Sequence, residues 1–201
     1  MNIDGTVYVI DDDRAVADST ALLMQSLGLA VATFASAEEF LAAYQPTMKG
    51  CVLLDLRMGG MDGLALMERL RELESPLAVV FLTAYGDVPT ALRALKDGAT
   101  HFLMKPAREH DLLEAVNRAL RAEQGQRPRA RMRSLLRTRL QSLTARESQV
   151  LEQVLAGRAT KAMATVLGIS ERTVEAHRAR AFEKLRVRSV PELVRAFDLL
   201  G

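Results

Sequence analysis

The sequence has few of the residues that mark several large classes of protein. Its 201 residues include one cysteine, Cys51, so no disulfide can form within the chain, and we expect Cys51 to be a small buried hydrophobic residue. No apolar run approaches the roughly 20 residues that a membrane-spanning helix needs. The N-terminus has no basic segment followed by an apolar stretch, so we expect no signal peptide. These absences predict a cytoplasmic protein without a membrane partner.

Charge is present in both signs but is unevenly distributed. Residues 1–120 contain 10 Lys and Arg against 17 Asp and Glu, a net charge of −7, whereas residues 121–201 contain 17 against 8, a net charge of +9. An acidic half joined to a basic half predicts two domains with different partners. The basic half is a candidate for nucleic-acid binding, although on charge alone a solvated basic surface is the simpler interpretation.

The first 120 residues alternate between two hydrophobic patterns. Short apolar runs rich in β-branched residues lie at residues 6–10, 30–34, 50–54, 78–82 and 101–104. After each of them, apolar residues recur with the helical period, as Val16, Leu23 and Leu27 do. Five strands alternating with five helices predict an α/β domain with a doubly wound, five-stranded parallel sheet covered on both faces. Such sheets place their sites at the carboxyl ends of the strands.

A basic segment follows this pattern. Residues 121–142 contain Gln, Gly, Pro and seven Arg against one Glu, which indicates a linker. Its second part, 129–141, fits a helix. The charge run agrees equally well with a solvated face and with a face that contacts phosphates.

The remainder of the chain has no strand pattern. Thr144 and Glu147 fit a capping box that opens a helix. Further helices fit residues 160–167, 171–185 and 190–199. We therefore predict three parts, namely an α/β domain at 1–120, a basic and partly helical linker at 121–142, and an all-α domain at 143–201.

Polar residues stand where the predicted strands end. Asp11 and Asp12 end the first strand, Asp55 the third, Thr83 the fourth and Lys105 the fifth. Taken singly, Thr83 fits a strand residue and Lys105 a surface lysine. Because the carboxyl ends of parallel strands converge, we expect all five side chains in one shallow pocket. Clustered carboxylates suit Mg²⁺, and Mg²⁺ with a lysine can stabilise phosphoryl oxygens while one carboxylate acts as the nucleophile.

Residues 1–120 resemble the receiver domain of two-component response regulators. The resemblance is carried by VIDDD, VLLDLRM, MDG, FLTAYGDV and HFLMKP, whose common spacing is far more specific than any one of them. It implies a CheY-like, flavodoxin-like receiver in which Asp55 accepts a phosphoryl group from a histidine kinase. The implied site residues are Asp12, Asp55 and the backbone carbonyl of Arg57 as direct Mg²⁺ ligands, Asp11 as a ligand through water, Thr83 and Lys105 as phosphoryl contacts, and Thr83 with Phe102 as the switch.

One feature departs from the receiver pattern. The family usually has proline after DLRM, whereas Gly59 and Gly60 follow Met58 in this chain. A glycine pair is more flexible than proline, so we expect a less rigid loop after Asp55. The chemistry does not require that proline, and the prediction of the site is unaffected.

The basic half contains a second motif. The stretch ATKAMATVLGISERTVEAHRARAFEKL reads as a helix, a turn at Gly168 and a second helix capped by Ser170, which is helix-turn-helix geometry. An αα-hairpin without a nucleic-acid role is the alternative. The positions that can face the core are Val174, Ala181, Phe182 and Leu185. The opposite face has Arg172, Glu175, Ala176 and Ala179, with Arg178 and Arg180 beside it, and these are the candidate DNA contacts.

The wider pattern from Leu143, "LTARE…VL…G…LGIS…TVE.H…KL.V.S..EL", resembles the LuxR-type DNA-binding domain. With the receiver, the whole chain is similar to the FixJ/NarL class of response regulators, and most closely to FixJ-type members. The resemblance implies that Thr173, His177 and Lys184 contact the DNA backbone. Glu175 and Ala179 occupy positions where some members carry basic base-reading residues, which leaves the base-reading set open.

The resulting hypothesis is a transcription factor controlled by phosphorylation. Its receiver would pair with a second copy through the fourth helix, fifth strand and fifth helix, and two LuxR-type domains would bind DNA. One alternative is a metal-dependent phosphohydrolase with an aspartyl-phosphate intermediate, against which the sequence offers no second acid or base and no cap-domain insertion. The other is a receiver that controls a protein partner, with no affinity for DNA.

Overall fold

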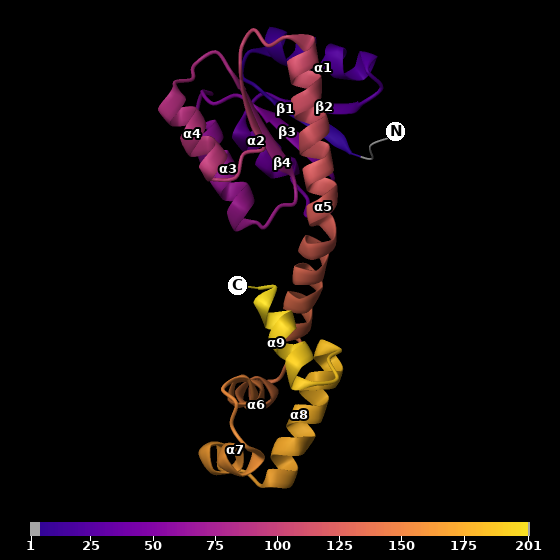
Figure 1. Ribbon diagram of the computed structural model, residues 1–201, viewed down its shortest axis with the longest axis vertical. Coiled ribbons are helices and arrows are strands. Elements are labelled where there is room, and N and C mark those ends of the chain that lie inside the picture. The colour runs from indigo at the N-terminus through magenta and orange to yellow at the C-terminus, as the bar shows by residue number, and fades with distance from the viewer. Residues whose placement is uncertain (1–4, 201) are drawn as a thin grey trace. The chain divides into compact units, whose positions relative to one another are not determined.

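The computed structural model describes residues 5–200. The chain divides into two compact units, residues 1–128 and residues 129–201, and each is described by itself. The course of the chain through strands and helices is drawn in Figure 1.

The first unit is built on a five-stranded parallel sheet with the order β2-β1-β3-β4-β5 (Figure 1). The strands are β1 (Thr6–Ile10), β2 (Ala30–Phe34), β3 (Gly50–Leu54), β4 (Ala78–Thr83) and β5 (His101–Met104). The predicted doubly wound α/β fold is confirmed, and β4 extends one residue beyond its predicted end. Because the chain leaves β1 in one direction and returns to β3 on its other side, a crevice opens at the carboxyl ends of these two strands.

Helices cover both faces of the sheet. They are α1 (Arg14–Ser26), α2 (Ala37–Ala43), α3 (Gly63–Glu72), α4 (Val88–Lys96) and α5 (Glu109–Gln141). Side chains alternate along each strand, so Val7 and Val9 pack with α1 and α5, whereas Tyr8 and Ile10 pack with α2, α3 and α4. Cys51 lies in the first of these layers, and burial raises the pKa of its thiol to about 12, which leaves it an unreactive part of the core.

The run of three aspartates after β1 serves two purposes. Asp13 caps α1, because its Oδ1 accepts hydrogen bonds from the amides of Ala15 and Val16 at 2.9 and 3.3 Å. Asp11 and Asp12 remain for the crevice at the end of the strand. The run therefore separates into one structural carboxylate and two that lie at the candidate site.

Helix α5 is longer than the sequence predicts. Residues 121–142 were expected to be a partly helical linker, but α5 runs through this segment to Gln141, with Pro128 inside it. An ion pair one turn apart supports it, since the Nε of Arg127 lies 2.5 Å from Oε1 of the buried Glu123. The division between the two units falls after Pro128, within the helix, so the domain boundaries at 120 and 142 remain predictions.

The second unit is helical, with a core that includes the last turns of α5. Its further helices are α6 (Ala145–Leu155), α7 (Thr160–Leu167), α8 (Glu171–Leu185) and α9 (Val190–Asp198). The predicted turn is present: Gly168 has a φ of +66°, which glycine adopts readily, and Ser170 caps α8 by accepting from the amide of Thr173 at 3.2 Å. The buried core consists of Leu136, Val150, Leu151, Val154, Met163, Val174, Ala181, Leu185 and Leu193. Within residues 5–200, no helix combines the length and the apolar character needed to cross a membrane.

Two arginines of the basic segment cap other helices. Arg139 donates from Nη1 to the carbonyl oxygen of Leu185, the last residue of α8, at 3.2 Å. Arg133 donates from Nε to the carbonyl oxygen of Leu199, after α9, at 2.5 Å. The last carbonyls of a helix have no partner within it, and a cation there also interacts favourably with the helix dipole. Part of the charge run therefore stabilises the helical unit, a role different from both a solvated and a phosphate-contacting face.

Leu136→Ala should lower the free energy of unfolding of the helical unit by about 2–5 kcal/mol, the usual cost of truncating a buried leucine. Leu136 is 3% exposed, whereas its neighbour Leu135 is 43% exposed and provides the control. Leu135→Ala should change stability by no more than about 0.5 kcal/mol. Denaturant unfolding of the full chain, with hydrogen exchange in α6–α9 as the local readout, checks this. Equal effects of the two changes would contradict the place of α5 in this core.

Candidate functional site

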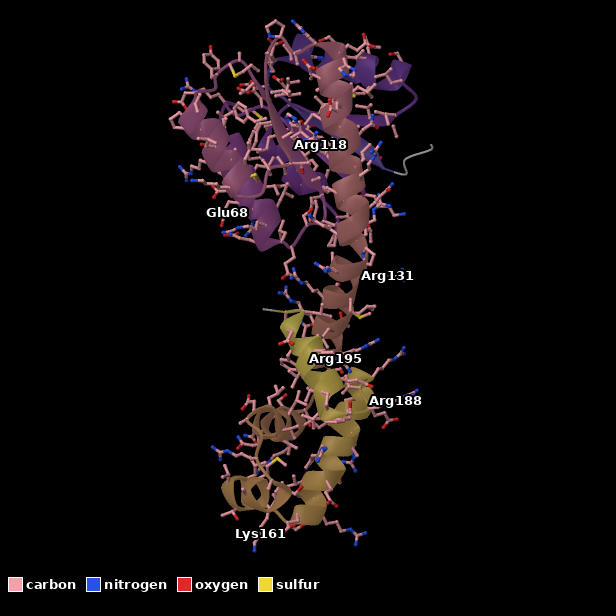
Figure 2. All side chains as sticks on the ribbon, viewed as in Figure 1. Glu68, Arg118, Arg131, Lys161, Arg188 and Arg195 are labelled. Carbon is pink, nitrogen blue, oxygen red and sulfur yellow. The ribbon has the colours of Figure 1, made fainter. Side chains whose placement is uncertain are left out.

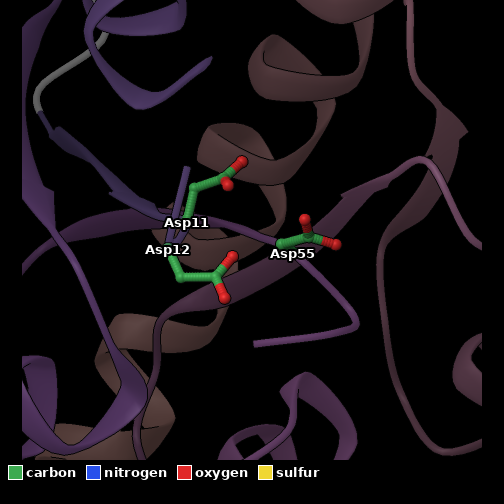
Figure 3. Close-up of side chains that lie close together, drawn as sticks. All are labelled: Asp11, Asp12 and Asp55. Atoms are coloured by element: carbon green, nitrogen blue, oxygen red, sulfur yellow. The ribbon is translucent and has the colours of Figure 1, made fainter. Parts of the chain in front are cut away.

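The crevice at the ends of β1 and β3 gathers three carboxylates. Ligand oxygens of Asp11, Asp12 and Asp55 all lie within 4.8 Å of one another (Figure 3). The register explains the meeting, because Asp11 and Asp55 each follow one member of the paired residues Ile10 and Leu54. Asp11 and Asp55 are buried, at 4% and 7% exposure, whereas Asp12 is exposed. The predicted cluster is thus assembled with its open side at Asp12.

Lys105 supplies the positive charge of the cluster. Its Nζ lies 2.5 Å from Oδ2 of Asp11 and 2.8 Å from Oδ2 of Asp55. Burial raises the pKa of Asp11, the hydrogen bond from Lys105 opposes this change, and the neighbouring Asp55 carboxylate adds to it. Burial alone would lower the pKa of Lys105, but its hydrogen bonds to Asp11 and Asp55 outweigh that effect and raise it. Lys105 is therefore charged and bridges the two buried carboxylates.

Backbone amides complete the surroundings of the carboxylates. Asp11 Oδ1 accepts from the amide of Asp13 at 3.1 Å, and Asp55 Oδ1 accepts from the amide of Arg57 at 3.3 Å. Asp12 Oδ2 accepts from the amide of Gly59 at 3.1 Å. These hydrogen bonds from backbone amides hold each carboxylate in its orientation. A set of carboxylate oxygens arranged in this way is a donor set that suits Mg²⁺.

The two positions assigned to the switch, Thr83 and Phe102, come from the neighbouring strands β4 and β5. Thr83 is fully buried, and its Oγ1 accepts from the amide of Tyr85 at 3.1 Å. Phe102 is half-buried against Phe81, with ring centroids 5.9 Å apart. The Lys105–Pro106 peptide bond is cis.

Three further contacts at this rim are not predicted from the sequence. The guanidinium of Arg57 lies over the ring of Tyr85, 4.8 Å from its centroid. The backbone of Gly86 lies against Phe102, since a Cβ at Gly86 would stand 2.8 Å from that ring. Glu38, from the first turn of α2, accepts from the amide of Met61 at 2.8 Å. Their sequence signals are weak, because each depends on the meeting of two separate segments of the chain.

In the second unit, α8 presents a mixed surface. Val174, Ala181 and Leu185 are buried as predicted, and Phe182 packs partly buried against the same core. The candidate contacts that are exposed are Arg172, Glu175, Ala176, Ala179 and Arg180, and those that are half-buried are Thr173, His177, Arg178 and Lys184. Arg178 lies over the ring of Phe182, 5.2 Å from its centroid. The exposed set agrees with a surface that can approach a groove, and its contacts with DNA stay a prediction.

Positive charge in this unit is not confined to α8. Figure 2 labels Arg131 on α5, Lys161 on α7 and Arg195 on α9, and all three are exposed. A basic surface spread over several helices attracts polyanions without selecting a sequence.

Lys184 differs from the other candidate contacts. Its Nζ donates to Oε2 of Glu147 at 2.6 Å and to the carbonyl oxygen of Ser142 at 3.0 Å. Glu147 is buried, and it also forms the capping box with Thr144 that opens α6. The hydrogen bonds from Lys184 and Thr144 lower the pKa of Glu147 to about 2. This ammonium therefore joins α8 to α6, an interaction between residues 37 positions apart that no local pattern reveals.

Comparisons with known proteins agree with this arrangement. A family model for the response regulator receiver domain matches residues 7–117, and one for bacterial regulatory proteins of the luxR family matches residues 141–197. The chain is 45% identical over 197 residues to the transcriptional regulatory protein FixJ of Azorhizobium caulinodans, and the aligned region covers 97% of this chain and 92% of FixJ.

Two further proteins extend the comparison. The response regulator protein TodT of Pseudomonas putida is 41% identical over 194 residues, covering 96% of this chain and 86% of TodT. The solved structure of the response regulator StyR, 40% identical, superposes with a TM-score of 0.65 and covers 96% of this chain and 98% of StyR. FixJ, TodT and StyR are all named as regulators, which agrees with the prediction of a regulator and not with the phosphohydrolase alternative.

Glu147→Gln should remove an acid-sensitive part of the stability of the helical unit. The folded pKa of Glu147 is about 2 and its ordinary value is 4.5, so its contribution is complete above about pH 4.5 and is lost as the pH falls through 2. The midpoint temperature of thermal unfolding at neutral pH should drop by at least about 4 °C, the shift that a loss of roughly 1 kcal/mol gives in a domain of this size. The difference in midpoint temperature between the variant and the parent should shrink as the pH falls from about 4.5 towards 2.

The control for this measurement is Glu152→Gln, which changes an exposed glutamate of the same helix. It should follow the parent at every pH. A constant offset between Glu147→Gln and the parent across the whole range would show that the charge of Glu147 has no part in the effect.

Proposed function

The chain belongs to the response regulators, as a receiver domain followed by a LuxR-type DNA-binding domain, and on this basis we propose that it is a transcription factor switched by phosphorylation of Asp55. The observation that carries the proposal is the cluster of Asp11, Asp12 and Asp55 bridged by Lys105. A cluster of this kind offers a nucleophile, a cation site and a fixed positive charge within one crevice. A DNA target would place the protein in the cytoplasm.

The reaction that we propose is transfer of a phosphoryl group from a histidine kinase. A carboxylate oxygen of Asp55 attacks the phosphorus, the P–O bond forms as the P–N bond breaks, and the histidine nitrogen leaves with the electron pair. Lys105 moves from the Asp55 carboxylate to the phosphoryl oxygens, and the Thr83 hydroxyl donates to another of them. Asp11, Asp12, Asp55 and the Arg57 carbonyl would hold Mg²⁺, which when bound neutralises charge on the phosphoryl group.

The switch that follows involves Thr83 and Phe102. Once the Thr83 hydroxyl turns to the phosphoryl group, its hydrogen bond from the Tyr85 amide is given up, and the β4–α4 loop is released. That loop lies against Phe102 at Gly86, so the ring and the loop move together. Apolar side chains are exposed on α4 and β5, namely Val88 at 72%, Leu92 at 53%, Leu95 at 44% and Met104 at 46%. We propose that this face pairs two receivers into a homodimer.

Pairing of receivers brings two DNA-binding units to one operator. Helix α8 enters the major groove with its exposed positions, and Arg172 and Arg180 are the candidates for contacts with base edges. Two copies would read half-sites about one helical turn apart or less. The net charge of +9 over residues 121–201 supplies the attraction that is independent of sequence.

Asp55→Asn should abolish phosphorylation and leave the fold intact, because the amide keeps the shape of the carboxylate but is not a nucleophile. Incubation with Mg²⁺ and a small phosphodonor, followed by intact-mass measurement, checks this. The matched control is Asp18→Asn, which changes an exposed aspartate on α1. If Asp55→Asn gained the phosphoryl mass to the parent's level, the assignment of the phosphoacceptor would be wrong.

DNA binding should be salt-dependent, and phosphorylation should strengthen it at specific sites. Each phosphate contact adds roughly 0.9 to the slope of log affinity against log salt concentration. Arg172→Ala or Arg180→Ala should cost about 1–3 kcal/mol at a single base position if that side chain reads a base edge. The charge-matched control is Arg118→Ala on the receiver, which should leave the position preference unchanged. Footprinting and titration with selected operators measure both.

The same titrations separate the alternatives. Absence of salt-dependent DNA binding would favour a receiver that controls a protein partner. If Asp55→Asn bound DNA with the full affinity of the phosphorylated parent, and no phosphodonor improved that binding, phosphorylation would not be the switch. Sustained turnover of a phosphorylated substrate would revive the phosphohydrolase alternative.

A further inference from the structure

The loop that follows Asp55 is held at two points by other elements. The amide of Gly59 donates to Oδ2 of Asp12, which lies after β1, at 3.1 Å. The amide of Met61 donates to Oε1 of Glu38, which lies in the first turn of α2, at 2.8 Å. The expectation of a loose glycine loop therefore needs revision, because two hydrogen bonds attach it to the rim of the crevice.

Glu38 and Gly60 fit one another closely. Gly60 has a φ of +92°, a conformation that glycine adopts readily, and a Cβ there would stand 2.8 Å from Oε1 of Glu38. The backbone of the loop thus lies directly against the Glu38 carboxylate. The amide of Met61 lowers the pKa of Glu38, so this acceptor is ionised at neutral pH.

Gly59 is different, because nothing in its own geometry requires glycine. Its φ is outside the left-handed region, and a Cβ there would meet no heavy atom within 4 Å. What distinguishes the position is the N–H. Receivers usually have proline at this place, and proline has no N–H to donate. The bond to Asp12 is therefore one that this chain can form and a proline-bearing loop cannot.

We propose that the Gly59 amide is a positioning group for the Mg²⁺ ligand Asp12, and that Glu38 holds the amide in place through Met61. The inference rests on the proposed function of the acidic cluster. Asp12 is the exposed member of the cluster, so without a donor its carboxylate is the one most free to turn towards solvent. A hydrogen bond on Oδ2 orients the carboxylate before the ion arrives, and ligating carboxylates oriented in this way bind metals more tightly.

The test compares two substitutions at Gly59 in the full chain. Gly59→Pro removes the amide donor, whereas Gly59→Ala adds one methyl group in open space and keeps the donor. Mg²⁺ is titrated into the unphosphorylated protein and followed by calorimetry. The Kd for Mg²⁺ should be about 10-fold higher in Gly59→Pro than in Gly59→Ala, the lower end of the usual effect of removing such a partner.

A second pair of substitutions tests the role of Glu38. Glu38→Ala removes the acceptor for the Met61 amide, and Glu38→Gln retains an oxygen that can accept it. Glu38→Ala should weaken Mg²⁺ binding in the same direction, and Glu38→Gln should restore most of the loss. Because both residues act through one hydrogen bond, Glu38→Ala combined with Gly59→Pro should lose no more than Gly59→Pro alone. Thermal unfolding in the absence of Mg²⁺ measures any general loss of stability separately.

The outcomes distinguish this inference from the proposed function. If Asp12→Ala loses Mg²⁺ binding but Gly59→Pro binds Mg²⁺ as tightly as Gly59→Ala does, or more tightly, the positioning role is wrong although the metal site is correct. Additive losses in the double variant would overturn the part assigned to Glu38. If the parent bound no Mg²⁺, or if Asp12→Ala bound it as well as the parent, the metal site itself would be wrong, and this inference with it.

Discussion

The rest of the receiver site depends on the ion pairs that the ammonium of Lys105 forms with Asp11 and Asp55. Two buried carboxylates cannot remain ionised side by side in a protein interior without a compensating charge, and Lys105 contacts both of them at 2.5 and 2.8 Å. With Asp12, the cluster contains three carboxylates and one ammonium. The two negative charges that remain equal the charge of one divalent cation. Lys105 therefore stabilises the two buried carboxylates but does not balance all three, so the cluster retains a net negative charge.

The sheet makes this arrangement possible through its register. Ile10 pairs with Leu54, so the aspartates that follow them lie at the same level on adjacent strands. Thr83 pairs with Met104, so Lys105 follows one residue beyond the end of the β4–β5 pair, and only a long side chain from there reaches back to β3. The positions of these residues at strand ends, more than their types, bring them together.

These features explain which parts could be predicted. Strand positions and strand-end residues are recorded locally, in apolar runs and in the residue that follows each run, and the helix-turn-helix is recorded in its turn and its cap. No local pattern predicts the remaining contacts, which are the helix caps by Arg133 and Arg139, the Glu147–Lys184 ion pair and the Gly59–Asp12 hydrogen bond. Each joins residues 37 to 66 positions apart, and no period or motif specifies such a meeting. Composition alone therefore predicts a linker for the basic segment, whereas two of its arginines cap helices.

The same distinction bears on Lys184 as a candidate DNA contact. To reach a phosphate, its ammonium would leave the buried Glu147 and the Ser142 carbonyl. A hydrogen bond to a charged group contributes about 1.5–3 kcal/mol, and leaving a buried charged acceptor unpaired costs at least as much. An exposed ion pair gains only about 0–1 kcal/mol. The balance favours Lys184 within the domain and would leave phosphate contact to exposed cations of the same unit, such as Arg131, Lys161 and Arg195.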